Sequence, residues 1–189
     1  MGNSTWDNTL DPFPTAIGAS FGTFTANQDI SPQPLPVVYG NELRLGSKLE
    51  LEAWGEYGST GTPTLLLSFY ITPSNLAAGI ALAATSAMAT STATLWPWHM
   101  HYSGIVTVLG AAGTATIVGS GICELGSSLT ALSGFAMPAT AAARTVSTVW
   151  STTVQQFLGV AATFSASSAS NLVRTHIFTA KIINQGKTQ

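Results

Sequence analysis

Apolar and polar side chains alternate strictly over Leu49–Trp54, which predicts a β-strand with one face on a core. Leu49, Leu51 and Ala53 fall on one side of this strand, and two glutamates and Trp54 fall on the other. The glycine-rich stretch 55–63 then breaks the alternation, as a turn does. Residues 64–71 form a nearly unbroken apolar and β-branched run, typical of a strand buried on both faces. Together these patterns predict a β-hairpin inside a sandwich.

A second hairpin is predicted from residues 96–109 and 114–123, which are joined by a turn at 110–113. In its first strand, Trp98, Met100 and Tyr102 share one face, and two histidines share the other. Further strands are predicted at 20–26, 145–154, 156–165 and 171–183. Residues 124–143 are expected to be loop-like with a short strand near Leu129, and 75–95 fits either a short helix at 77–89 or a loop with a weak strand. At least eight strands at this spacing predict an all-β fold, an antiparallel β-sandwich of jelly-roll type.

The first 36 residues differ from the remainder, because they hold five of the nine prolines. Proline favours an extended backbone with few hydrogen bonds. The segment also carries aromatic side chains that a solvated linker would lack: Trp6, Phe13, Phe21 and Phe24. We therefore predict an extended N-terminal arm over 1–36 and a single sandwich domain over 37–189. The arm packs either on its own domain as an edge strand or on a neighbouring subunit or capsid.

The composition combines 46% hydrophobic residues with only 7% charged residues, where about 25% is usual in soluble domains. Two explanations compete: insertion into a membrane, or a surface covered by partners and copies of the same chain. The most apolar window, 65–89, is interrupted at 72–75 and is too short to span a membrane. Six scattered basic residues and a net charge of −2 offer no basic stripe for a nucleic acid. The composition therefore favours assembly, without membrane or nucleic acid.

Few residues suggest catalysis. His99 and His101 alternate on one strand and could hold a metal with His176 or a carboxylate, but aromatic-polar positions at the surface or at an interface are the favoured interpretation. Glu50 and Glu52 are interpreted as solubilising residues, or as a guard on an exposed edge, rather than a catalytic pair. The lone Cys123 is interpreted as a small buried residue. We expect no enzyme activity, no bound metal and no cofactor.

Five stretches of the chain resemble small virion structural proteins from tailed phages of actinobacteria. They are Leu49–Gly55, Ser59–Leu65, Trp96–Tyr102, Arg144–Val146 and Gly159–Ser165. The resemblance extends over about 31–183. It implies a capsid decoration (cement) protein, commonly a trimer, that is made in the host cytoplasm and resides on the virion. Its partner would be the major capsid protein, whose subunits it would bridge to stabilise the shell.

Similar sequences also occur in receptor-binding modules of phage tails. The alternative function is therefore a tail-fibre or tail-tip domain that recognises a host surface glycan through residues 55–63 with Trp54 and Tyr57. The interface candidates are Trp54, Tyr57, Trp96 and Trp98, and the candidates for contact with the capsid or a neighbour are the four aromatic residues of the arm.

Overall fold

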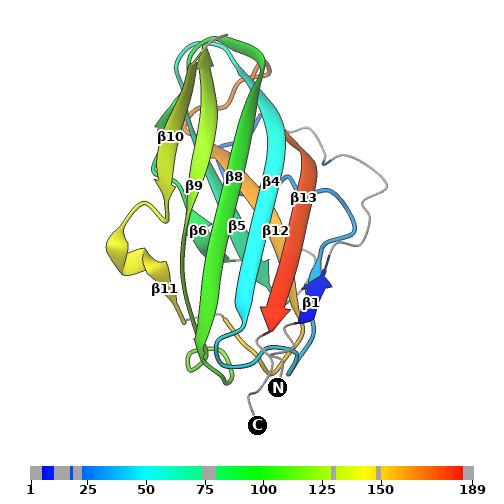
Figure 1. Cartoon of the computed structure of the whole chain (residues 1–189). Helices are drawn as coiled ribbons and strands as arrows, with labels where there is room; N and C mark the ends of the chain where they lie inside the picture. The colour runs from blue at the N-terminus through cyan, green and yellow to red at the C-terminus, as the bar shows by residue number, and fades with distance from the viewer. Residues whose placement is uncertain are drawn as a thin grey trace.

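The computed structural model describes residues 6–10, 18, 23–73, 80–128, 131–147 and 150–184. These residues form two antiparallel β-sheets that pack face to face (Figure 1). The stacked rings of Phe69 and Phe178 join the two sheets, with centroids 5.9 Å apart. The predicted all-β sandwich is therefore confirmed.

The larger sheet, sheet A, has the order β1-β13-β4-β8-β9-β10, and β11 also pairs with β9. Its strands are β1 (Trp6–Thr9), β4 (Lys48–Ser59), β8 (Ala93–Val108), β9 (Thr116–Ser128), β10 (Ala131–Met137), β11 (Thr145–Val146) and β13 (Leu172–Asn184). A short 3₁₀ helix, η1 (Ala141–Arg144), connects β10 to β11 at one edge of the sheet (Figure 1).

The smaller sheet, sheet B, has the order β2-β12-β5-β6, with β3 also on β12 and β7 also on β5. Its strands are β2 (Gln28–Asp29), β3 (Val37–Val38), β5 (Thr64–Thr72), β6 (Ile80–Ala84), β7 (Met88–Ala89) and β12 (Gln156–Phe164). Every strand pairing described in either sheet is antiparallel.

The alternation in the sequence correctly predicts which side of each long strand faces the core. In β4, Leu49, Leu51 and Ala53 are buried in the core, whereas Trp54 is exposed on the opposite face. The second half of β5 is buried on both faces, as its apolar run predicts, and Tyr70 lies on the side away from the inter-sheet core. Burial of these apolar side chains is the main stabilising contribution to such a sandwich.

The hairpin predicted from 49–54 and 64–71 is wrong. β4 pairs with β13 and β8 in sheet A, whereas β5 pairs with β12 and β6 in sheet B. The strand β4 also runs on to Ser59, so that Gly55 and Gly58 lie within it rather than in a turn. The connection at 60–63 therefore carries the chain from one sheet to the other. The hairpin predicted from 96–109 and 114–123 is confirmed as β8 and β9.

Two weakly patterned segments contain more strands than the weak strand expected within 75–95 and the short strand expected near Leu129. Residues 124–143, expected to be loop-like, complete β9 and form β10. Within 75–95, the described residues form β6, β7 and the start of β8, and no helix lies among them. The strand predicted over 145–154 is too long. Among the described residues of this range, only Thr145–Val146 is in a strand. Small residues hide strand periodicity, because alanine and glycine fit either face of a sheet.

The described parts of the first 36 residues pair with their own domain. β1 lies along β13 at the edge of sheet A, and β2 lies along β12 at the edge of sheet B. Ile30 donates a backbone hydrogen bond to Val160, and Leu158 donates one to Pro36. Three prolines between β2 and β3 occupy this edge because proline has no N–H for a central ladder position. Of the predicted strand at 20–26, residues 23–26 are described, and they are not in a strand.

The jelly-roll connectivity is not confirmed. The strands β8, β9 and β10 follow one another in sequence and are also neighbours in sheet A, which makes that part of the sheet a meander. The chain returns to sheet B in β12 and closes in sheet A with β13, between β1 and β4.

Candidate interaction face

The outer face of sheet A is the side turned away from sheet B, and it carries apolar side chains that the core does not use. They include six that are at least 38% exposed: Trp54, Ile105, Val118, Ile122, Leu132 and Ile177. The strand register places Ile177 opposite Trp54, and Ile105 opposite Val118. We call these six residues the outer-face set. On a sheet face exposed to solvent the outward positions are normally polar, so this set makes the outer face of sheet A a candidate for contact with another molecule.

Trp54 is the centre of this face. Its side chain is 47% exposed, and its indole stacks on the imidazole of His99 from the neighbouring strand β8. Nε2 of His99 lies 2.9 Å from Oε1 of Glu52, and Nδ1 lies 3.3 Å from Oε2 of Glu124. The imidazole is therefore fixed by three contacts, and it holds the indole in one orientation.

The histidines considered as metal ligands have other partners in the structure. The two carboxylates of Glu52 and Glu124 are bound to different nitrogens of one ring, so both ring nitrogens are already engaged. His176 lies 3.5 Å from Glu56, which also pairs with Arg174, away from His99. Among the described residues, no group of three or more histidine, cysteine or acidic side chains is arranged to hold a metal ion.

Two hollows lie on this face. The first has a volume of about 160 Å³ and is lined by Trp54, Pro97, Trp98, His99, Glu124 and Leu132. The second has a volume of about 260 Å³ and is lined by Glu50, Leu51, Glu52, His101, Thr179 and Lys181. The first is mainly apolar with one carboxylate, and the second combines two glutamates and a lysine with uncharged residues.

The two glutamates of β4 have a role different from the one expected. Glu50 pairs with Lys48 at 2.6 Å, and Glu52 contacts His99. β4 lies between β13 and β8, so neither glutamate is on a sheet edge, and a guard against edge pairing is excluded for them. They are polar members of the outer face, and Glu52 orients its histidine.

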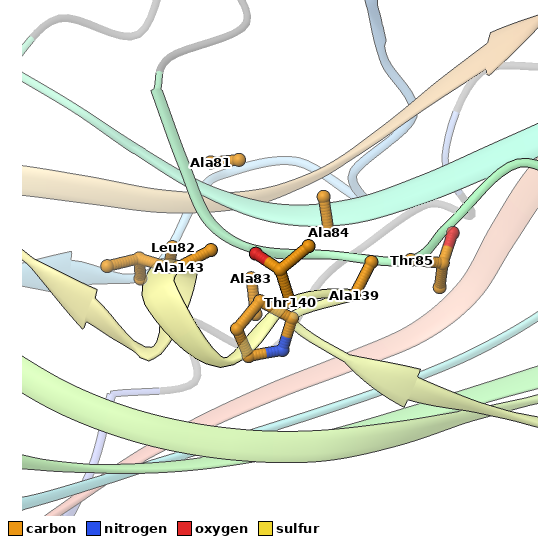
Figure 2. A pocket seen from close by; sticks show the side chains of 9 residues that line it. Ala81, Leu82, Ala83, Ala84, Thr85, Ala139, Thr140 and Ala143 are labelled. Atoms are coloured by element: carbon orange, nitrogen blue, oxygen red, sulfur yellow. The ribbon is translucent and has the colours of Figure 1, made fainter.

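A third hollow, also of about 160 Å³, lies between β6 and the segment 138–143 (Figure 2). Its walls are mostly alanine methyl groups, and the hydroxyl of Thr85 already accepts a hydrogen bond from the Leu67 amide. The lining contains no charged side chain. It offers nothing that would select a ligand.

Among the predicted interface residues, only Trp54 is strongly exposed. Tyr57 and Trp98 are buried in the core, where the hydroxyl of Tyr57 donates to the Gly126 carbonyl at 2.6 Å. Nε1 of Trp98 donates to the Glu56 carbonyl at 3.2 Å. Trp96 is partly buried, with its ring packed edge-on against Tyr57. A loop that presents both Trp54 and Tyr57 is therefore excluded, because the two residues lie in one strand and face opposite sides.

The aromatic residues expected to anchor the arm are described only in part. Phe24 is buried, and its ring centroid lies 5.6 Å from that of Phe164. Trp6 belongs to β1 by its backbone, and Phe13 and Phe21 lie outside the described residues. Phe24 therefore packs on its own domain.

The buried ionisable groups belong to the core. Cys123 is buried with its Sγ 3.8 Å from Sδ of Met88, and burial, with a smaller contribution from Glu124, raises the pKa of its thiol to about 12. Burial also raises the pKa of Tyr57 and of Tyr102 to about 12. All three groups are neutral at physiological pH, as their apolar surroundings require.

Sequence reasoning found Trp54 and the histidines but missed the rest of the outer-face set. The missing signal was present at Ile105, Ile122 and Ile177, which are apolar at positions that alternate with core residues. No protein-family model matches the chain, and no curated protein is significantly similar to it. The part of the chain that is described contains no helix long and apolar enough to cross a bilayer.

Proposed function

We propose that this chain is a structural protein of a phage virion, a decoration (cement) protein that self-associates and binds the outer surface of the capsid. The observation that carries the proposal is the outer-face set on sheet A, in a chain with only 7% charged residues. Exposed aromatic and aliphatic side chains gathered on one face are typical of protein interfaces. The resemblance to small virion proteins supports the same function.

The proposed mechanism is mechanical and involves no catalysis. Copies of the sandwich, most simply a trimer, sit on the capsid and contact more than one major capsid subunit. Each contact is modest, but contacts repeated over a symmetric lattice act together and raise the overall affinity. Bridging neighbouring subunits would resist the opening of a shell under internal pressure from packaged DNA.

Co-sedimentation with capsids tests the proposal. The purified chain is mixed with capsids of its phage that lack it, and the capsids are pelleted. We expect saturable binding by the wild type and at least a tenfold loss of affinity for the double variant Trp54→Asp, Ile177→Asp. Val154 is equally exposed but lies outside sheet A, so Val154→Asp is the matched control. Absence of wild-type binding to capsids would refute the proposal.

A second candidate is a tail domain that binds a host glycan. It is favoured by one observation, the hollow where the exposed indole of Trp54 lies beside the carboxylate of Glu124. Aromatic rings stack on sugar rings, and carboxylates accept hydrogen bonds from hydroxyl groups. Binding to isolated host cell-wall glycan, lost in Trp54→Ala and in Glu124→Gln, would support this function.

A further inference from the structure

The hollow beside Trp54 is open in the structure and is bordered by a stacked pair of rings. Stacking on His99 holds the indole, with ring centroids 3.8 Å apart, and Leu132 and Pro97 complete the apolar wall. A cavity of about 150 Å³ is large enough for a benzene-sized group, and this hollow has a volume of about 160 Å³. It therefore has room for one large side chain from a partner.

The charge around the hollow is negative. Glu52 and Glu124 both contact the one imidazole of His99. Even a fully protonated His99 balances only one of the two carboxylates. A positive group of a partner would therefore find an unbalanced carboxylate next to an aromatic ring, a combination that suits a guanidinium through pairing and cation–π contact.

The same chain presents a matching knob, the loop 39–46 before β4. Tyr39 and Leu45 are 62% and 64% exposed, among the most exposed large apolar residues described. The loop is held by backbone hydrogen bonds from Asn41 to Thr152 at 2.6 Å and from Gly46 to Val106 at 2.9 Å. Oε2 of Glu42 also accepts a hydrogen bond from the Tyr39 amide. A held loop with exposed apolar side chains loses little conformational entropy on binding.

Arg44 lies on this knob and is exposed. Within the described residues, the basic side chains of Lys48 and Arg174 are in ion pairs with glutamates, whereas Arg44 and Arg144 are in none. Arg144 follows three alanines of η1 and has no large apolar neighbour in that helix. Arg44 is next to Leu45, so the knob offers both the positive group and the apolar group that the hollow would accept.

We propose that Leu45 of one copy inserts into the hollow of a second copy, against Trp54 and Leu132, while the neighbouring Arg44 pairs with Glu124, which also lines the hollow. This inference rests on the self-association in the proposed function and specifies its contact. Knob and hollow are different surfaces of the chain, so the contact is heterologous. Contacts of this kind close into a ring when the rotation between copies closes, and otherwise extend.

Light scattering on charge-reversed variants tests the contact. We expect the wild type to form an oligomer, and Arg44→Glu and Glu124→Arg each to raise the dissociation constant at least tenfold. Mixing these two variants should restore association, because the acidic knob of the first variant then meets the basic hollow of the second. The native knob of the second variant likewise meets the native hollow of the first. The double variant Arg44→Glu, Glu124→Arg should also associate.

The controls separate the contact from its alternatives. Arg144→Glu reverses the other unpaired arginine and should leave the mass unchanged, and thermal melting shows that each variant is folded. Leu45→Ala and Leu132→Ala weaken the contact without changing charge. If the wild type forms an oligomer and Arg44→Glu does not change its mass, this contact is overturned but self-association is not. The same conclusion follows if Arg144→Glu is the one variant that dissociates the oligomer. If the wild type remains a monomer at high concentration, both the contact and self-association are overturned. Binding to the capsid is then still tested on its own, by co-sedimentation.

Discussion

The indole of Trp54 and the imidazole of His99 stack across two neighbouring strands, with 22° between the rings. The pair lies on the outer face of sheet A, where Trp54 remains 47% exposed. An exposed tryptophan that is already ordered loses little entropy when it binds, and such residues often dominate the energy of an interface. This pair is the central feature of the proposed interaction face.

Replacing Trp54 with alanine should therefore weaken association much more than folding. We expect at least a tenfold rise in the dissociation constant of self-association, measured by light scattering over a concentration series. The free energy of unfolding should fall by only about 1 kcal/mol, the usual contribution of an aromatic pair. Val154→Ala, at an exposed position outside sheet A, should change neither quantity. Equal association by Trp54→Ala and wild type would remove Trp54 from the interface.

The buried hydrogen bond of Tyr57 gives a prediction about the core. Tyr57→Phe removes the hydroxyl that donates to the Gly126 carbonyl at 2.6 Å. We expect the free energy of unfolding to fall by about 1 to 2 kcal/mol, because the buried carbonyl loses this donor. Chemical denaturation measures the loss. Tyr39→Phe, at an exposed tyrosine, is the matched control and should have no effect on stability.

The close approach at Gly55 gives a second prediction about the core. A Cβ on residue 55 would lie 2.1 Å from the Arg174 carbonyl oxygen and 2.3 Å from Cζ2 of Trp98. Gly55→Ala should lower the free energy of unfolding by about 1 to 3 kcal/mol, the range for overpacking a sheet interior. Gly134→Ala is the control, because its Cβ would meet only Cδ1 of Ile122, at 3.7 Å. Similar unfolding midpoints for the two variants would contradict the packing at Gly55.

Alkaline pH should destabilise the fold. The pKa values of Cys123, Tyr57 and Tyr102 are raised to about 12 by burial, from 9.0 for the thiol and 10.0 for the phenols. Between pH 9 and pH 12 the unfolded chain therefore loses these protons first, and stability falls as pH rises. Each group adds a slope of up to about 1.4 kcal/mol per pH unit. Denaturation at pH 8, 10 and 11 measures this slope, and Cys123→Ala should flatten its lower part.

Removing the first 36 residues should destabilise the sandwich. The deletion takes away β1, β2 and the buried Ile30 and Leu35, and it exposes the edges of β13 and β12. We expect a lower melting temperature and a loss of soluble protein on heating. Deletion of residues 1–5, which leaves β1 and β2 in the chain, is the control. A 37–189 fragment as stable as the full chain would show that the segment is a separable arm.

Much of the fold follows from the sequence because the period of two determines which side of a strand faces the core. This reasoning gave the strands β4, β5, β8, β9, β12 and β13, the inward positions of Leu49, Leu51 and Ala53, and the face that Trp98 shares with Met100 and Tyr102. The same period does not determine which strands pair. β4 and β5 are consecutive in the sequence, yet they lie in different sheets because β13 and β12 return to pair with them.

The candidate site was less predictable than the strands, because the exposure of a side chain depends on how the strands pair and pack. Tyr57 and Trp98 are aromatic like Trp54, but they point into the core, and only the burial of their side chains distinguishes them. The knob at Arg44 and Leu45 contains no motif. Its significance comes from the hydrogen bonds that hold the loop and from the hollow on the outer face.

The most direct test of the central proposal is a cryo-electron microscopy reconstruction of the virion. We predict density for a two-sheet sandwich on the outer surface of the capsid, with the outer face of sheet A covered by a capsid subunit or by a neighbouring copy. Density for the sandwich only at the tail, or a capsid-bound sandwich with Trp54 and Ile177 open to solvent, would contradict it.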